Sequence, residues 1–178
     1  MEILDGDRII LRSLSLDDAE MIERYASDYE LAKTTLNIPH PYPKGSAKAF
    51  VANVLEEETE GRNVTFAIVG KEDHNLIGLI GLRPVKAYRR GELGYWIGKP
   101  FWGNGYGTEA AKLVIKYGFE ALNLNRIYAA AFTSNPGSWR IMEKCGMKHE
   151  GIFRHHVIKE GKPLDLTYYS ILKEEYFG

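Results

Sequence analysis

Apolar and polar positions along the chain follow two periods, which together predict seven strands and four helices. Alternating or continuous apolar runs predict strands over residues 8–14, 63–70, 76–85, 91–98, 125–132, 149–159 and 163–173. Apolar positions three and four residues apart predict helices over residues 16–27, 47–61, 106–121 and 136–146. The connections within residues 63–98 are too short for crossover helices. We therefore expect a mostly antiparallel sheet flanked by helices, an α+β fold of order βααβββαβαββ.

Local signals mark where several of these elements begin and end. Ser15 precedes a helix with acidic residues in its first turn, and Asn135-Pro136 is typical of an N-cap followed by the first helical residue. Gly146 is expected to end the last helix. Three prolines within residues 39–43 predict an irregular, stiff segment between the first two helices.

Composition narrows the classes to which the chain can belong. At 178 residues we expect a single domain over residues 1–178. A net charge of −1 gives no overall attraction to nucleic acid or to an anionic membrane, so neither is an expected partner. The single Cys145 excludes an internal disulfide, and five histidines without cysteine partners predict no metal site. The N-terminus has no basic leader followed by an apolar run, so we expect a cytoplasmic location.

A segment rich in glycine, FWGNGYGTEAAK at residues 101–112, leads directly into the third predicted helix. The start of a helix offers unpaired N–H groups and a positive dipole end, and Gly103, Gly105 and Gly107 would let a diphosphate approach them. An awkward turn is the alternative. Gly105 to Ala110 also fits the dinucleotide pattern G-x-G-x-x-A, but no acidic residue follows about 20 positions later. The lysine motif of nucleotide hydrolases is missing as well.

The segments around these glycines resemble the GNAT N-acetyltransferase superfamily. The most specific ones are ELGYWIGKPFWGNGYGTEA, NRIYAAAFTSNPGSWRIMEKCGM, EGIFR and GKPLDLTYYSILKEE, and the resemblance covers essentially the whole chain. The chain is similar in particular to the branch that acetylates the N-termini of ribosomal proteins. The resemblance implies the acyl-CoA N-acyltransferase fold, with the seven-stranded sheet splayed between its fourth and fifth strands. It also implies acetyl-CoA as the cosubstrate and no metal.

The resemblance assigns cofactor-binding roles to two parts of the chain. The family's diphosphate-binding segment aligns with residues 102–107, although Trp102 stands where the family has a basic residue or glutamine. The implied main-chain contacts to the diphosphate come from Gly103, Asn104, Gly105, Tyr106, Gly107 and Thr108. The implied pantetheine contacts come from Tyr95, Trp96 and Ile97 in the splay and from Asn135, for which a helix N-cap is the alternative role.

The resemblance also points to candidate catalytic residues. Ser138 completes N-x-x-S, which the ribosomal-protein branch links to protonation of the departing CoA thiolate, whereas a capping serine is the alternative. Met142 occupies the position at which other members have a tyrosine, and methionine cannot donate a proton. The attacking amine must be neutral, and we expect Glu92 to act as the base. A surface glutamate paired with Arg89 or Arg90 is the competing interpretation, and Glu150 is the reserve candidate.

The acceptor is the least specified part of the prediction. Tyr42, in the proline-rich segment, is expected to border its site. A protein N-terminal α-amine, such as that of a ribosomal protein, is the leading acceptor, with small amines, antibiotics and lysine as alternatives. A non-catalytic acyl-CoA sensor remains a second class of function, and the chain is expected to be a monomer or a homodimer.

Cys145 is expected to be a buried apolar residue rather than a nucleophile. Arg154, Asp165 and Tyr169 match the branch's last hairpin or only brace the sheet.

Overall fold

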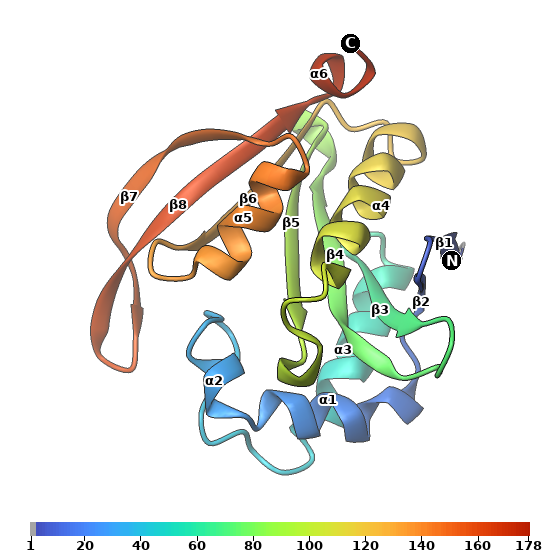
Figure 1. The fold of residues 1–178 in the computed structure, drawn as a ribbon, viewed down its shortest axis with the longest axis vertical. Coiled ribbons are helices and arrows are strands. Elements are labelled where there is room, and N and C mark those ends of the chain that lie inside the picture. The colour runs from blue at the N-terminus through green and yellow to red at the C-terminus, as the bar shows by residue number, and fades with distance from the viewer. Residues whose placement is uncertain (1–2) are drawn as a thin grey trace.

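A computed structural model describes residues 3–178 and shows one sheet of eight strands in the order β1-β2-β3-β4-β5-β6-β8-β7 (Figure 1). The bounds are β1 Leu4–Asp5, β2 Ile9–Ser13, β3 Val64–Gly70, β4 Leu76–Val85, β5 Arg90–Ile97, β6 Arg126–Phe132, β7 Lys148–Lys159 and β8 Lys162–Leu172. The sequence predicted seven of these eight strands and missed β1, which pairs with β2 through Leu4 and Leu11. Two residues are too short a run to show an alternation. Every pairing is antiparallel except that of β5 with β6.

Within residues 3–178, six α-helices accompany the sheet. They are α1 Ala19–Ala26, α2 Tyr29–Ala32, α3 Ser46–Thr59, α4 Tyr106–Glu120, α5 Pro136–Lys144 and α6 Lys173–Phe177. Ser15 begins the first helical segment with a capping box to Asp18, and the turn at residues 16–18 is a 3₁₀ helix. The short helices α2 and α6 were not expected, because four or five residues show no helical period.

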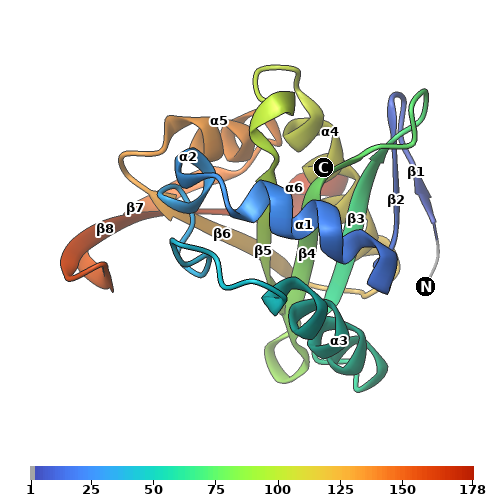
Figure 2. The ribbon, with the colours of Figure 1, turned by 90° about the horizontal axis from the view of Figure 1, so that it is seen from below.

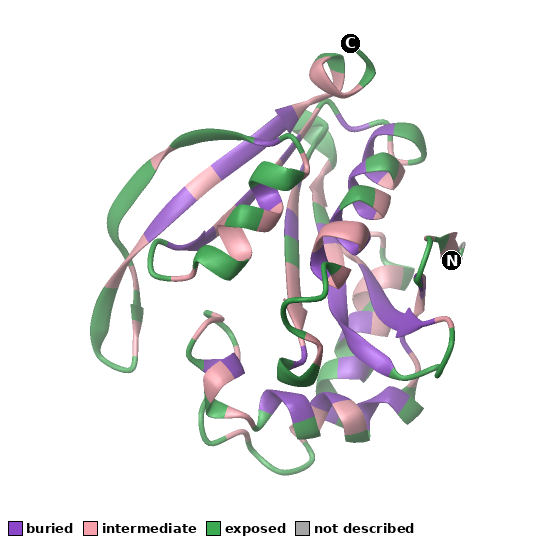
Figure 3. Ribbon diagram, in the orientation of Figure 1, coloured by how far each residue is buried: buried purple, intermediate pink, exposed green. Residues whose placement is uncertain are grey.

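Helices cover both faces of the sheet. Helices α4 and α5 lie on one face and α1 and α3 on the other (Figures 1 and 2). The larger core joins Phe66 and Leu82 of the sheet to Val114 of α4, and the smaller one joins Ala67 of the sheet to Val51 of α3. Each fully buried large apolar side chain contributes about 1.5–3 kcal/mol. Burial is densest in β3 and β4, at the centre of the sheet (Figure 3).

Strands β5 and β6 pair only at their beginnings. Arg90, Gly91 and Glu92 are opposite residues 126–128, and no pair follows, although β5 continues to Ile97 and β6 to Phe132. On its other side β5 stays paired with β4 as far as Ile97. The predicted splay between these two strands is therefore confirmed, and it gives β5 an unpaired backbone edge from residue 93 onward.

The hairpin of β7 and β8 extends away from the rest of the sheet (Figure 1). Its register shifts twice, after His149 and after Phe153, and such bulges bend a strand. Near its tip the ammonium of Lys159 donates to the carbonyl oxygens of Ala32 at 2.7 Å and Ile38 at 3.1 Å, and also to that of Thr35. The tip of the hairpin is thereby attached to the segment that follows α2.

A polar brace joins the three strands on this side of the sheet. The guanidinium of Arg126 on β6 donates two hydrogen bonds to the carboxylate of Glu150 on β7, and the hydroxyl of Ser170 on β8 donates a third. Hydrogen bonds from Arg126 and then Ser170 lower the pKa of Glu150 to about 2.

We expect Glu150→Gln to lower the stability of the fold in a pH-dependent way. A carboxylate whose pKa falls from 4.5 to about 2 on folding contributes stability above pH 4.5, and this contribution is lost as the pH falls towards 2. Because the pair is partly exposed and screened by solvent, the loss at neutral pH should be about 1 kcal/mol or less. Urea unfolding at several pH values should show the difference from wild type shrinking below pH 4.5. Glu20→Gln, at an exposed site, is the control, and a pH-independent difference for Glu150→Gln would contradict the expectation.

We also expect Gly78→Ala to destabilise the centre of the sheet. A β-carbon at Gly78 would lie 2.2 Å from the carbonyl oxygen of Trp96, and backbone cannot move aside as a side chain can. The cost should be about 1–3 kcal/mol, typical of overpacking. Gly94→Ala on the neighbouring strand is the matched control, since nothing lies within 4 Å of its added carbon. Equal denaturation midpoints for the two variants would show the expectation to be wrong.

Candidate active site

The glycine segment forms a loop whose backbone suits an anion. Gly103 and Gly105 have φ angles of 77° and 79°, in the left-handed region that favours glycine. Gly105 is the N-cap of the 15-residue helix α4 and has no side chain to accept from its first N–H groups. Nothing lies within 4 Å of a carbon added at Gly103. The N–H groups of Tyr106, Gly107 and Thr108 therefore begin the helix without a side-chain acceptor, as a diphosphate requires.

Gly107 has a different role from the other two glycines. Its φ is not positive, and a β-carbon there would lie 2.7 Å from Cδ1 of Ile141 and 3.4 Å from Cγ1 of Ile97. The glycine at this position thus allows α4 to pack closely against α5 and the end of β5. Its N–H still belongs to the first turn of α4.

Arg8 supplies a cation beside the loop, which the sequence pattern did not reveal. Its guanidinium donates to the carbonyl oxygen of Asn104 at 2.7 Å and to the carboxylate of Glu109 at 3.0 Å. It also lies 4.7 Å from the centre of the Tyr106 ring. Trp102, at the position where the family has a basic residue or glutamine, instead donates from its indole to the carbonyl oxygen of Ile97 at 2.7 Å. No local signal could connect Arg8 with a loop about a hundred residues later.

The three residues expected to line the splay lie on two faces of the sheet. Tyr95 and Ile97 pack towards the core under α4 and α5, whereas Trp96 packs towards the core under α1 and α3. Trp96 also contacts Tyr25 of α1 edge to face, with ring centres 6.5 Å apart. All three predicted residues are half-buried at the unpaired end of β5. The side chains thus flank the splay from both sides.

Ser138 lies in the first turn of α5 and meets a side chain of β5. Its hydroxyl donates to the phenol oxygen of Tyr95 at 3.2 Å, and the phenol donates to the carbonyl oxygen of Ser138 at 2.8 Å. Burial raises the pKa of Tyr95 well above its ordinary value. Met142, one turn later, is buried and contributes only to the apolar core.

Asn135 is the N-cap residue of α5, followed by Pro136 as predicted, but its side chain makes no capping hydrogen bond. Its amide instead donates to the carbonyl oxygen of Thr34, at 3.3 Å, in the segment that follows α2. The backbone N–H of Ser138 does bond to the carbonyl oxygen of Asn135, at 3.1 Å. The side-chain carbonyl of Asn135 has no donor among residues 3–178 and is free to accept from a ligand.

Glu92 is the last residue of β5 that is paired with β6, directly opposite Tyr128. The competing interpretation of a pair with Arg89 or Arg90 is wrong: Arg89 bonds to Asn123, and Arg90 lies 5.1 Å from the Tyr88 ring centre. Within the described part of the chain, the side chain of Glu92 has neither an ion pair nor a hydrogen bond, although its charge helps to raise the pKa of Tyr128 and of Tyr168. Its carboxylate is therefore available at the point where the strands begin to separate.

The reserve base Glu150 is a poor candidate, because a carboxylate with a pKa of about 2 has little tendency to take a proton. Tyr42 is half-buried and packs on the side of the sheet that α1 and α3 cover, together with Trp96. It shares no hydrogen bond with Ser138 or Glu92.

The remaining polar residues singled out from the sequence lie on or beside the hairpin of β7 and β8. The carboxylate of Asp165 accepts from the backbone N–H of His155 at 2.7 Å, and the phenol of Tyr169 donates to Glu143 at 3.1 Å, so both brace the structure. Arg154 lines an open hollow together with His155 and Asp165. Among the described residues no group of His, Cys, Asp and Glu is arranged to hold a metal ion.

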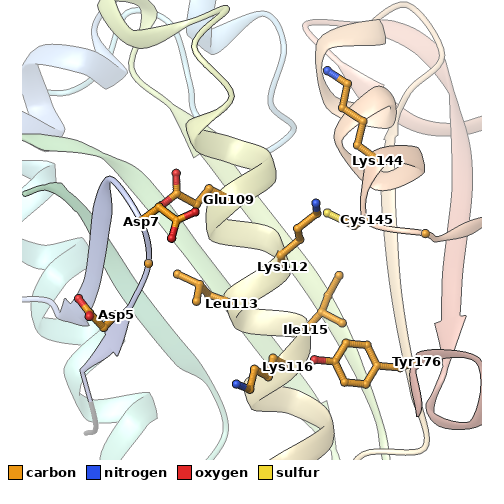
Figure 4. A pocket seen from close by; sticks show the side chains of 12 residues that line it. Asp5, Asp7, Glu109, Lys112, Leu113, Ile115, Lys116, Lys144, Cys145 and Tyr176 are labelled. Atoms are coloured by element: carbon orange, nitrogen blue, oxygen red, sulfur yellow. The ribbon is translucent and has the colours of Figure 1, made fainter. Parts of the chain in front are cut away.

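Cys145 lines a separate open cavity of about 600 Å³ on the outer side of α4, between the turn after β1, the end of α5 and α6. Lys112 extends towards the thiol, and Tyr176 lies at the far end (Figure 4). Burial raises the pKa of Cys145 to about 11, against the opposing effect of Lys112. Cys145 is half-buried rather than buried as expected, but a thiol that stays protonated is a poor nucleophile. The cavity contains none of the candidate catalytic residues.

Comparison with known proteins shows the family to which the chain belongs. The sequence model of the Acetyltransferase (GNAT) domain family matches residues 8–148. An uncharacterized N-acetyltransferase of Bacillus licheniformis, p20, is 34% identical over the full length of both chains. A GNAT-family acetyltransferase structure from Bacillus anthracis superposes with a TM-score of 0.86, at 28% identity, over 98% of this chain and 100% of that one.

A more distant structure shares the fold: the ribosomal-protein-S5-alanine acetyltransferase of Vibrio fischeri has a TM-score of 0.85 at 22% identity, with 99% of each chain covered. Within residues 3–178 no helix is long and apolar enough to cross a membrane. The loop, the splay and these similarities lead to one conclusion: the chain belongs to the GNAT family and is an N-acetyltransferase that uses acetyl-CoA as its cosubstrate.

Proposed function

We propose that this N-acetyltransferase acetylates a primary amine, foremost the N-terminal α-amine of a protein such as a ribosomal protein. The observation that supports it most is the glycine loop at the start of α4, directly beside the splay of β5 and β6. The loop suits a diphosphate, and the splay suits an extended chain that carries the thioester.

The diphosphate is held by main-chain N–H groups of residues 103–108, with the positive end of the α4 dipole behind them. Arg8 adds a positive charge that Glu109 partly neutralises. The pantetheine arm lies in the splay, where the free side-chain carbonyl of Asn135 accepts a hydrogen bond from one of its amides. A backbone N–H on the unpaired edge of β5 meets the thioester oxygen and stabilises its negative charge during attack.

Acetyl transfer is a direct attack. The amine nitrogen forms a bond to the thioester carbon, the carbon–sulfur bond breaks, and the amine loses a proton to Glu92, directly or through water. The hydroxyl of Ser138 gives its hydrogen to the departing sulfur and regains one from solvent. Bringing the two reactants together on one scaffold supplies much of the rate.

An α-amine is favoured over a lysine amine for a simple reason. An α-amino group has a pKa of about 7.7–8 and a lysine one of about 10.4, so far more of the former is neutral near pH 7. The fold similarity to an acetyltransferase named for the alanine of a ribosomal protein supports the same acceptor class. Tyr42 remains the proposed acceptor contact, on the face that also carries Trp96.

Three broader features complete the proposal. Residues 1–178 form a single N-acetyltransferase domain, supported by one sheet that contains strands from residue 4 to residue 172. The proposed location is the cytoplasm, in keeping with a lone unpaired cysteine. The enzyme acts as a monomer or a homodimer.

The acceptor class can be tested by measuring thiol release from acetyl-CoA with a panel of amines. The panel contains peptides with free N-terminal alanine or serine, the same peptides with blocked N-termini and one lysine, spermidine, and an aminoglycoside. We expect the free peptides to react fastest and the blocked ones to lose most of the rate. Faster reaction of spermidine or the aminoglycoside would overturn the protein N-terminus as acceptor.

A companion variant separates catalysis from mere binding of acyl-CoA. Glu92→Gln should lower the rate, most strongly at low pH where neutral amine is scarce, and should leave the affinity for acetyl-CoA unchanged. An unaltered pH–rate profile would remove Glu92 as the base. Binding of acetyl-CoA without thiol release across the whole panel would favour a sensor.

We expect Gly105→Val to weaken acetyl-CoA binding by at least tenfold, about 1.4 kcal/mol. Its side chain would enter the space that the diphosphate occupies, and its φ of 79° would be strained in valine. Gly161→Val, at a φ of 76° in the turn between β7 and β8, carries the same strain away from the loop. Calorimetric titration with acetyl-CoA should distinguish the two variants, and equal affinities would remove the loop as the diphosphate site.

A further inference from the structure

Two hydrogen bonds cross the splay from β5 to α5, and both involve the phenol of Tyr95. Tyr95 lies three residues beyond Glu92, the last residue of β5 that pairs with β6. Its ring packs into the core under α4 and α5, and its hydroxyl reaches the first turn of α5. A side chain of β5 is thereby hydrogen-bonded to α5, the helix that follows β6.

The phenol fixes Ser138 at two points. It accepts from the serine hydroxyl at 3.2 Å and donates to the carbonyl oxygen of the same residue at 2.8 Å. The serine hydroxyl has no other partner within the described residues, and the side chain of Asn135 does not cap the helix before it. Without the phenol, a serine in a first helical turn is free to rotate among its three rotamers or to bond to nearby backbone.

The surroundings keep this pair in one protonation state. Because burial raises the pKa of Tyr95, the phenol remains neutral throughout the physiological range and is both a donor and an acceptor. When the serine hydrogen turns towards an anionic sulfur, the phenol hydrogen lies close enough to Oγ to replace it. The serine oxygen then stays oriented while its hydrogen is shared with the ligand.

We propose that Tyr95 is a positioning residue, which orients the hydroxyl of Ser138 towards the sulfur of CoA. This inference rests on the proposed role of Ser138. It assigns to Tyr95 a function in the departure of the thiolate, beyond lining the pantetheine slot.

The test compares Tyr95→Phe, Ser138→Ala and the double variant with a matched control. The control is Tyr169→Phe, which removes a phenol bond to Glu143 on the same helix, away from Ser138. The first measurement needs no acceptor: it is the pKa of the thiol of bound CoA, followed by thiolate absorbance. A hydrogen bond to the thiolate lowers that pKa, so Ser138→Ala and Tyr95→Phe should both raise it, and Tyr169→Phe should not.

The second measurement is turnover with the best acceptor peptide of the panel. Both single variants should lower kcat about threefold to tenfold, as expected for one lost hydrogen bond, with acetyl-CoA affinity within about twofold of wild type. The double variant should be no slower than Ser138→Ala, because the phenol acts through the serine.

The outcomes distinguish failure of this inference from failure of the proposed role of Ser138. If Ser138→Ala leaves both the thiol pKa and kcat unchanged, the role of Ser138 is wrong and the inference falls with it. If Ser138→Ala is impaired but Tyr95→Phe matches Tyr169→Phe, only the inference is overturned. Additive losses in the double variant would also overturn it, because the two hydroxyls would then act separately.

Discussion

The separation of β5 from β6 is the constraint on which the candidate site depends. Three residue pairs hold the strands together, and beyond Glu92 the edge of β5 has no partner strand. An unpaired edge in the middle of a sheet costs hydrogen bonds, so something must compensate for it. In this chain part of the compensation comes from the indole of Trp102, which donates to the backbone carbonyl oxygen of Ile97 at 2.7 Å. Tyr95 also bridges the gap by donating to the carbonyl oxygen of Ser138 on α5. The remaining backbone groups of this edge are those to which we propose that the thioester arm binds.

The site therefore combines rigid and open parts. The sheet beneath β5 is densely packed, as the close approach of Gly78 to Trp96 shows, whereas the loop at Gly103 has space above its backbone. The charges follow the same division. The carboxylate of Glu150 on β7 is engaged by Arg126 and Ser170, while the carboxylate of Glu92 on β5 has no hydrogen bond or ion pair within the described residues. The first of these carboxylates therefore braces the sheet, and the second is the one for which we propose a catalytic role.

The sequence predicted most elements because they are long enough for their periods to show, as in α4 and the hairpin of β7 and β8. It missed β1, α2 and α6, which are too short. The splay between β5 and β6 was predicted only from the family resemblance, because the hydrophobic pattern of a strand does not indicate where it separates from its neighbour. Through-space partners were equally hidden: Tyr95 and Ser138 are 43 residues apart, and Arg8 and Asn104 are 96 apart. Asn135 was correctly predicted as the residue before α5, but its side chain donates to the carbonyl oxygen of Thr34 and does not cap the helix.

The attachment of Lys159 to the carbonyl groups after α2 links parts of the molecule that the sheet alone would leave independent. The same segment is held at Thr34 by Asn135, at the end of β6. The segment after α2 is therefore attached to the sheet at two places, through Lys159 on the hairpin of β7 and β8 and through Asn135 after β6. A change in the length of the hairpin turn would shift Lys159 and the segment that it contacts, and through Thr34 it would displace Asn135, the proposed pantetheine contact.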